Sequence, residues 1–275
     1  MIVTLDRILQ QADQKGYAVP AFNVYNMETV LGVMQAARET RAPVIFQMYS
    51  RLFDGPEARL TAPCILQAIA DLDTPAAFHL DHGAGVPEVM RALRYGASGI
   101  MVDASLQPLE ANIAATREVV ALCSDCGVGV EGELGHIGKT ADASMGEYTK
   151  VDEAVRYVRE TGVCALAILV GTAHGHYKQA PVLDIRRIAD IKAAARIPLV
   201  LHGGSGVPDD QIRMAVAAGI RKMNFGTDVC CSFLDSAAAV SRDIIALDLF
   251  MKQPVEAVKQ YAMSKIELLG AAGNG

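Results

Sequence analysis

The sequence predicts an α/β protein of the (β/α)8, or TIM-barrel, class, in which residues 1–275 form one domain with a helical extension at the C-terminal end. Short apolar runs alternate with segments of helical periodicity, and eight such strand and helix units fit into the chain. A closed parallel barrel of this kind uses about 250 residues. Glycine-rich stretches follow several different strands, which argues against a dinucleotide fold with one Gly-x-Gly-x-x-Gly after its first strand.

Each expected strand is a short apolar run bounded by turn residues or polar residues. The strands are expected at residues 18–24, 43–49, 76–81, 98–102, 128–133, 164–170, 198–201 and 221–225. Helical periodicity fills residues 27–39, 87–95, 108–126, 151–161, 184–195 and 209–218. Asn26 is expected to cap the first of these helices, and Pro87 lies in the first turn of the second. A further helix is expected to begin with Thr61 as its cap and to run toward Leu72.

Two stretches depart from this alternation. Residues 135–149 lack apolar periodicity and are expected to form a surface loop, and such loops on a rigid scaffold often carry function. Residues 228–275 are expected to be mostly helical, with a last helix at 254–269 and no linker that would indicate a second domain.

Composition and charge exclude several classes of protein. With 51% hydrophobic residues and a mean hydropathy of +0.23, the chain can bury a large core, which excludes a disordered protein. The net charge of −6 and the absence of a basic run disfavour nucleic acid as a partner, although a small anionic substrate needs only local positive potential. The first residues do not form a secretory signal, and no run of 18 apolar residues indicates a membrane span.

The cysteines do not have the spacing of a disulfide scaffold, so reduced thiols in a cytoplasmic protein are expected. They are Cys64, Cys123, Cys126, Cys164, Cys230 and Cys231. Cys123 and Cys126 form a Cys-x-x-Cys pair late in an expected helix, without a second pair, so the pattern is a weak indication of metal or redox chemistry.

Polar residues with chemical potential follow most of the expected strands. They are Asp81 with His82, Asp103, Glu133, His174, His202, and residues 224–228. A barrel brings the C-terminal ends of its strands to one mouth, where active sites of this architecture lie. Three imidazoles, from His82, His174 and His202, suit a catalytic zinc ion that keeps one position open for substrate. His176 is an alternative to His174, and histidines with purely structural roles are the alternative to a metal site.

Small flexible turns follow the last two expected strands. They are Gly203-Gly204-Ser205-Gly206 and Asn224-Phe225-Gly226-Thr227. The loops after strands seven and eight are the usual phosphate-binding place in this architecture. Gly171 and Gly175 flank His174 and would let backbone approach the same ligand. The sequence therefore predicts a phosphate site here, while tight loop geometry alone remains the alternative.

These residues together resemble the class II, zinc-dependent ketose-bisphosphate aldolases of the fructose- and tagatose-bisphosphate type. The resemblance covers about nine tenths of the chain, in the order and spacing of that family. The matching stretches are Pro20-Ala21-Phe22-Asn23, Asp81-His82, Asp103-Ala104-Ser105, Glu131-Gly132-Glu133-Leu134-Gly135, Gly171-Thr172-Ala173-His174-Gly175, Leu201-His202-Gly203-Gly204-Ser205-Gly206, Asn224 and Thr227.

The resemblance implies a role for each matching residue. His82, His174 and His202 would bind zinc, Asp81 would be the proton donor, and Asp103 and Glu133 would offer a second or displaced metal site. The phosphate of dihydroxyacetone phosphate, with a monovalent cation nearby, and the rest of the substrate would be bound by Asn23, Gly175, Gly203, Gly204, Ser205, Asn224, Phe225, Gly226 and Thr227. A homodimer or homotetramer is expected, with a small sugar phosphate as the only other partner and neither nucleic acid nor membrane.

Such an aldolase uses zinc as a Lewis acid to stabilise the enediolate left when the carbon–carbon bond breaks. The competing Schiff-base mechanism needs a lysine that points into the barrel. The sixth expected strand has no lysine, and Lys222 on the eighth is a poorer candidate than the histidine set.

The chain departs from the family pattern at two places. The loop reads Gly138-Lys139-Thr140-Ala141-Asp142 and looks shorter than in many relatives, which leaves the base at carbon unassigned, with Asp142 or Glu147 as weak candidates. Residues 247–252, where fructose-bisphosphate members place an arginine on the distal phosphate, offer only Lys252.

We therefore expect a ketose 1-phosphate substrate that gives dihydroxyacetone phosphate and an unphosphorylated aldehyde. A carboxylate or a hydroxyl at its far end would contact the loop from His136 to Glu147. The alternatives are an ordinary fructose- or tagatose-1,6-bisphosphate aldolase and a non-catalytic sugar-phosphate-binding subunit.

Overall fold

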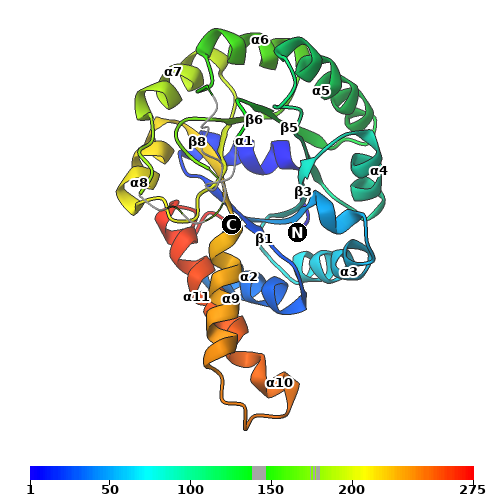
Figure 1. Cartoon of the computed structure of the whole chain (residues 1–275), viewed down its shortest axis with the longest axis vertical. Coiled ribbons are helices and arrows are strands. Elements are labelled where there is room, and N and C mark those ends of the chain that lie inside the picture. Colours follow the sequence, from blue (N-terminus) through cyan, green and yellow to red (C-terminus); the bar gives the residue numbers. More distant parts are fainter. Residues whose placement is uncertain (138–146, 174, 176, 178–179) are drawn as a thin grey trace.

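Eight parallel strands form a closed barrel in a computed structural model that describes residues 1–137, 147–173, 175, 177 and 180–275. Each strand pairs with its neighbours along the chain, and β1 closes the ring against β8 (Figure 1). The strands are β1 (Val19–Asn23), β2 (Val44–Tyr49), β3 (Ala76–Gly83), β4 (Gly99–Val102), β5 (Gly129–Leu134), β6 (Ala165–Ile168), β7 (Leu199–Leu201) and β8 (Ile220–Phe225). The predicted (β/α)8 barrel is thereby confirmed.

Helices cover the outside of the barrel because each presents an apolar stripe to the strands. The covering helices are α2 (Met27–Thr40), α3 (Glu57–Ala70), α4 (Val86–Arg94), α5 (Leu109–Ser124), α6 (Val151–Thr161), α7 (Ile185–Ala195) and α8 (Asp209–Ala218). The short 3-10 helix η1 (Ser50–Phe53) follows β2. Among the described residues, no helix is long and apolar enough to cross a membrane.

Helix α1 (Leu5–Lys15) lies across the end of the barrel where the strands begin. It contacts β1, β3, β4, β5 and β8, and its apolar face is buried. A side chain at Gly99, the first residue of β4, would meet the Cβ of Leu5 at 2.9 Å, which shows how closely the helix seals this end. The opposite end, where the strands finish, is therefore the open mouth.

The local predictions are mostly confirmed. Asn26 caps α2, and its side chain accepts a hydrogen bond of 2.9 Å from the backbone N–H of Thr29. Pro87 lies in the first turn of α4. The prediction that Thr61 caps a helix is wrong, because α3 begins at Glu57 and Thr61 lies inside it.

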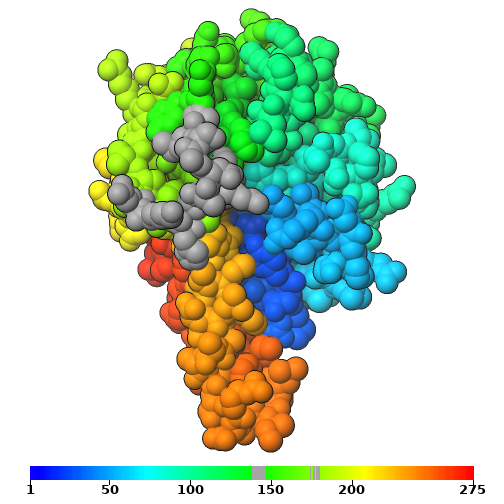
Figure 2. Space-filling view, in the orientation of Figure 1, coloured from blue at the N-terminus to red at the C-terminus, as the bar shows by residue number. Residues whose placement is uncertain are grey.

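The C-terminal helices form an arm that extends away from the barrel (Figures 1 and 2). They are α9 (Thr227–Ala239), α10 (Leu247–Phe250) and α11 (Lys252–Leu268), and they confirm the expected helical extension. Helix α11 packs on both α2 and α9, which fixes the base of the arm to the barrel wall. Helix α9 begins directly after β8, so the arm starts at the mouth.

Candidate active site

The C-terminal end of β3 carries Asp81 and His82 next to each other. Consecutive side chains on a regular strand point to opposite faces, so only one of them could face the barrel interior. Here the pairing with β4 shifts register between Leu80 and Gly83, which is a β-bulge, and His82 has a positive φ of 55°. Positive φ is unfavourable for a residue with a Cβ and is concentrated at functional sites. The bulge brings both side chains to the mouth.

Gly83 makes this bulge possible. A Cβ at Gly83 would lie 2.8 Å from the carbonyl oxygen of Met101 on β4 and 2.7 Å from Cδ2 of Leu80. Both distances are shorter than a van der Waals contact, and the clash with the Met101 carbonyl would push β3 away from β4. The position of the catalytic candidates therefore depends on the absence of a side chain at Gly83.

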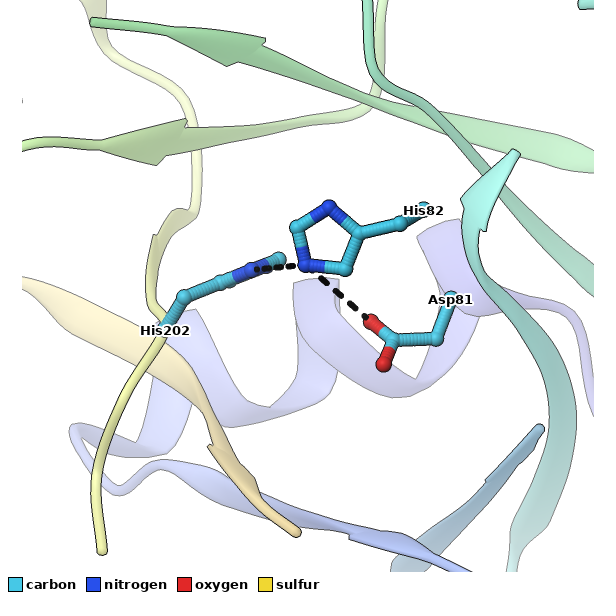
Figure 3. Close-up of side chains that lie close together, drawn as sticks. All are labelled: Asp81, His82 and His202. Atoms are coloured by element: carbon cyan, nitrogen blue, oxygen red, sulfur yellow. Dashed lines mark hydrogen bonds and ion pairs between the residues drawn. The ribbon is translucent and has the colours of Figure 1, made fainter. Parts of the chain in front are cut away.

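His82 and His202 face each other at the mouth (Figure 3). His202 follows β7 directly and is fully buried. Its Nδ1 lies 3.1 Å from Nε2 of His82, and the two ring planes are nearly perpendicular, at 84°. Asp81 Oδ1 lies 3.9 Å from the same Nε2. The ligand atoms of these three residues all lie within 4.8 Å of one another, which is close enough for one metal ion.

A carboxylate lies behind each histidine. Asp103 Oδ2 is 2.8 Å from Nδ1 of His82, and Glu131 Oε1 is 2.9 Å from Nε2 of His202. When each of these ring nitrogens donates its hydrogen to the carboxylate, the lone pair of the other nitrogen points at the opposite histidine. Two lone pairs 3.1 Å apart repel each other unless a proton or a metal ion lies between them. Because metal-binding histidines have such carboxylate partners, these residues fit a metal ion.

The carboxylates give this part of the mouth a strong affinity for cations. Burial alone would lower the pKa of His82, but Asp81, Asp103 and Glu133 outweigh it and raise this pKa to about 9. Burial tends to raise the pKa of Asp103, yet hydrogen bonds from His82 and Ser105 hold it well below its usual range. Burial and the charge of Asp103 raise the pKa of Glu133 to about 8. A bound cation relieves this repulsion among buried negative charges.

Two amide groups orient Asp81. The Nδ2 of Asn23 donates to Oδ2 at 2.7 Å, and the Nδ2 of Asn224 donates to Oδ1 at 3.2 Å. Behind them, Gln47 donates to Asn23 Oδ1 at 2.8 Å, and Lys222 donates to Asn224 Oδ1 at 2.8 Å. These outer bonds fix which way each amide faces, so the carboxylate has one preferred orientation.

Lys222 is fully buried inside the barrel and is paired with Glu131, at 2.8 Å between Nζ and Oε2. The same carboxylate orients His202, so the lysine charge supports the histidine through Glu131. Burial and the nearby Lys222 lower the pKa of His79 well below its usual value, which keeps that ring neutral. A paired ammonium is not an available nucleophile, and β6 contains no lysine. The geometry thus argues against Schiff-base chemistry.

Asp103 and Glu133, the candidate second metal site, meet through Ser105. The Ser105 Oγ lies 2.7 Å from Asp103 Oδ1 and 3.0 Å from Glu133 Oε1. With His82, the two carboxylates form a second group whose ligand atoms lie within 4.8 Å of one another. His82 belongs to both groups, so the two candidate metal positions share one ligand.

The loops after β7 and β8 pack against each other. The N–H of Gly204 donates to the carbonyl of Asn224 at 3.1 Å, and the N–H of Asp228 donates to Ser205 Oγ at 3.2 Å. Gly203 has a positive φ of 66°, and a side chain there would collide with the carbonyl of Ala173. Only glycine fits at this position.

The start of α9 adds hydrogen-bond donors to the same place. The helix begins at Thr227, so its first turn lies beside the loop after β7, where the N–H of Asp228 already donates to Ser205. Gly226 lies against Asn23, whose Oδ1 would be 3.0 Å from a Cβ at this glycine. The Phe225 side chain is buried and stacks on Phe22, with ring centroids 5.7 Å apart, so only its backbone faces the loops.

Comparison with known proteins decides the family. The sequence profile of class-II fructose-bisphosphate aldolases matches residues 3–274. The chain belongs to this family. It is therefore an enzyme, an aldolase that acts as a carbon–carbon lyase.

Relatives of this aldolase are similar over their whole length. The 6-phospho-5-dehydro-2-deoxy-D-gluconate aldolase of Bacillus subtilis is 33% identical over 98% of this chain and 96% of its own. The crystal structure of the YdjI aldolase from Escherichia coli K12 matches with a TM-score of 0.91 and 30% identity, over 99% of both chains. A putative fructose-1,6-bisphosphate aldolase from Coccidioides immitis has a TM-score of 0.89 and 26% identity, over 97% of this chain and 96% of its own.

Some predicted residues of the aldolase lie outside the described residues. These are His174, its alternative His176, and residues 138–146, which include Asp142. Gly175 is described and has a φ of 107°, a conformation that favours glycine. Glu147, the other candidate base at carbon, is 85% exposed and pairs with Lys150 at 3.1 Å.

The sequence analysis did not predict the positioning role of three buried residues that the structure places behind the site, Gln47, Glu131 and Lys222. Their spacing carried a signal. Glu131 precedes Glu133 by two residues and Lys222 precedes Asn224 by two, so each pair shares one face of a strand. A polar residue two positions before an inward-facing site residue is therefore expected to lie inside the barrel, directly below the site.

Proposed function

We propose that this aldolase catalyses the zinc-dependent cleavage, and in reverse the condensation, of a phosphorylated ketose to give dihydroxyacetone phosphate and an aldehyde. One observation carries the proposal. Two histidines, each oriented by its own carboxylate, direct their lone pairs at one point next to Asp81, which two amides hold in place. An ordinary structural histidine pair needs neither arrangement.

His82 and His202 would bind the zinc ion together with His174. Zinc supplies Lewis-acid chemistry, which stabilises the negative charge that develops on the substrate oxygens during cleavage. Asp103 and Glu131 hold the two rings in the tautomer that binds metal, and Asp103 with Glu133 offers the alternative metal position. The monovalent cation near the phosphate stays a prediction.

Asp81 would move the proton at the oxygen of the aldehyde half. In cleavage the carboxylate removes the hydroxyl proton at the carbon that becomes the aldehyde, and in condensation it returns that proton. Its hydrogen bonds from Asn23 and Asn224 restrict the carboxylate to one orientation, which lowers the entropic cost of reaching the reactive geometry. The base at carbon remains unassigned.

The phosphate of the donor half would lie at the loops after β7 and β8. The loop from Gly203 to Ser205 and the N-terminus of α9 would hold it, because helix N-termini favour anions. The N–H groups of Gly204 and Asp228 already donate to Asn224 and Ser205 in this place. Residues 224–227 border the same place, and Gly175 stays a predicted phosphate contact.

The relatives support the expected kind of substrate. The name 6-phospho-5-dehydro-2-deoxy-D-gluconate describes one phosphate next to a ketone and a carboxylate at the other end. Numbered from the phosphate end, that compound is a ketose 1-phosphate. Aldol cleavage between its third and fourth carbons gives dihydroxyacetone phosphate and 3-oxopropanoate. We propose a substrate of this class, with a single phosphate and a carboxylate or hydroxyl at its far end.

A cleavage panel tests the proposal. Release of dihydroxyacetone phosphate is measured from 6-phospho-5-dehydro-2-deoxygluconate, fructose 1-phosphate, tagatose 1-phosphate and the two 1,6-bisphosphates, with and without a chelator. We expect activity on a monophosphate that chelator removes and zinc restores. A preference of about 100-fold or more for a bisphosphate, which is what binding of a second phosphate provides, would show that the enzyme is an ordinary bisphosphate aldolase. Undiminished activity after exhaustive chelation would contradict the zinc mechanism.

The arm supports the expected homodimer or homotetramer. It exposes large apolar side chains, with Leu234 62%, Ile245 91% and Leu247 66% accessible to solvent. Apolar surface concentrated on a projecting element favours association with a second copy. Light scattering on the purified enzyme tests this, and a monomer at micromolar concentration would contradict it. All six cysteines are free thiols, which supports the expected cytoplasmic location.

A further inference from the structure

A stack of side chains leads outward from the histidine pair along the end of β2. Tyr49 is the last residue of β2 and pairs in register with Asp81, so the two leave the sheet side by side. The Tyr49 ring contacts the His82 ring, with centroids 5.5 Å apart. The guanidinium carbon of Arg51, in η1, lies 4.8 Å from the centroid of the Tyr49 ring. Arg51 is thus held at the mouth by stacking.

Arg51 is not neutralised. It is exposed, and in the part of the chain that the structure describes no carboxylate lies within ion-pair distance of it. Arg91, by contrast, forms an ion pair with Asp54, at 2.7 Å.

The guanidinium of Arg51 lies over the Tyr49 ring. Its planar set of N–H donors matches a carboxylate bidentately. Stacking on Tyr49 also restricts the long side chain before a ligand binds, which lowers the entropic cost of binding. Arg51 is therefore suited to bind one carboxylate.

The position of Arg51 corresponds to the far end of the substrate, an assignment that rests on the proposed function. With the donor phosphate at β7 and β8, the carbon chain passes the histidine pair and reaches Asp81 on β3, where the aldehyde oxygen forms. In this arrangement the remaining carbons would pass Asp81 toward the neighbouring strand β2, which ends at Tyr49 and is followed by Arg51.

We propose that Arg51, supported by Tyr49, binds a carboxylate on the aldehyde half and thereby selects acid-terminated ketose 1-phosphates. One exposed guanidinium balances the single charge of a carboxylate. A phosphate dianion would need further donors, and the described residues provide no second unpaired cation in the Arg51 and Tyr49 stack.

Condensation kinetics test this inference on the zinc-loaded enzyme. Dihydroxyacetone phosphate is combined with 3-oxopropanoate, with the neutral 3-hydroxypropanal, or with glyceraldehyde 3-phosphate, and kcat/KM is measured for each aldehyde. We expect Arg51→Met to reduce the preference for 3-oxopropanoate over 3-hydroxypropanal by roughly 10- to 150-fold, the range for one charge-assisted contact. Arg51→Lys should retain part of the preference, because it keeps the charge and loses the bidentate geometry.

Arg59→Met is the matched control, since Arg59 is an exposed arginine on the neighbouring helix α3, and its preference should equal that of the unmodified enzyme. An unchanged preference in Arg51→Met would overturn the inference, as would a larger effect on glyceraldehyde 3-phosphate than on 3-oxopropanoate. Equal losses on all three aldehydes would show a structural role instead. Failure of the unmodified enzyme to condense any aldehyde would count against the proposed function and is recognised before any variant is compared.

Discussion

Replacement of Asp81 by asparagine separates proton transfer from architecture. The variant keeps the shape of the side chain but removes the group that exchanges a proton. We expect kcat to fall by about 10²–10⁴, the range for losing a positioned acid–base group, with KM nearly unchanged. The zinc content should stay near that of the unmodified enzyme, because the carboxylates that orient His82 and His202 are Asp103 and Glu131.

The structure also predicts a cost in stability for Asp81→Asn. In the variant the remaining oxygen can accept from Asn23, and the new amide group then faces the Nδ2 of Asn224. In the unmodified protein this Nδ2 donates to Asp81 at 3.2 Å. Asn224 cannot turn over, since its oxygen accepts from Lys222 at 2.8 Å. One buried donor is left without an acceptor, which costs about 1–3 kcal/mol of unfolding free energy.

A control variant separates the two effects. Thr116→Val removes a buried hydroxyl between α5 and α6 that bonds Tyr157 at 2.7 Å and Asn112 at 3.1 Å, and should lose comparable stability while keeping its turnover. Turnover is measured by coupling dihydroxyacetone phosphate release to NADH oxidation, zinc by elemental analysis, and stability by urea denaturation. If Asp81→Asn lowered kcat by less than about tenfold, or raised KM by as much as it lowered kcat, Asp81 would not be the proton-transfer group.

Three further results are expected. The pKa of His82 is raised to about 9 in the folded, metal-free protein, from an unfolded value near 6.5. The ionised ring therefore stabilises the fold fully below about pH 6.5, and this stabilisation is lost as the pH rises through 9. The same proton competes with the metal, so zinc affinity measured by chelator competition should increase with pH and level off above about 9; a flat profile would refute this. Lys222→Met should cost about 3–5 kcal/mol in urea denaturation, because Glu131 is left as a buried unpaired charge. The double variant Lys222→Met/Glu131→Gln should be more stable than Lys222→Met alone, and the opposite order would show that the pair does not act as a unit. His202→Ala should lose bound zinc and cleavage together, whereas a variant that keeps activity without zinc would contradict the metal site.

Much of the fold was readable from the sequence, because its signals are local. Apolar runs of strand length alternate with helical periodicity along the whole chain, and each signal depends on neighbouring residues only. The cap at Asn26 and the proline in the first turn of α4 are local in the same way. The start of α3 was missed because its N-terminal residues carry no side-chain cap, so nothing in the sequence marks Glu57 as the first residue.

The chemical identity of the mouth residues was also readable, since the C-terminal ends of parallel strands converge whenever a barrel closes. Asp81, His82, Asp103 and His202 were expected near one another, and the structure brings them together. The ion pair between Glu131 and Lys222 was not expected. The two residues lie on β5 and β8, far apart in sequence, and nothing in the sequence indicates that they are partners.

Only the tertiary structure decided how these groups face one another. The bulge at His82 places two consecutive side chains on one side of a strand, against the period of two that a sequence implies. The tautomers of His82 and His202 follow from carboxylates on β4 and β5 that no sequence spacing connects to them. Arg51 is one exposed arginine among many in the sequence, and only the packing of Tyr49 between it and His82 turns it toward the mouth. Sequence determines which groups a strand end carries, whereas orientation depends on contacts between strands distant along the chain.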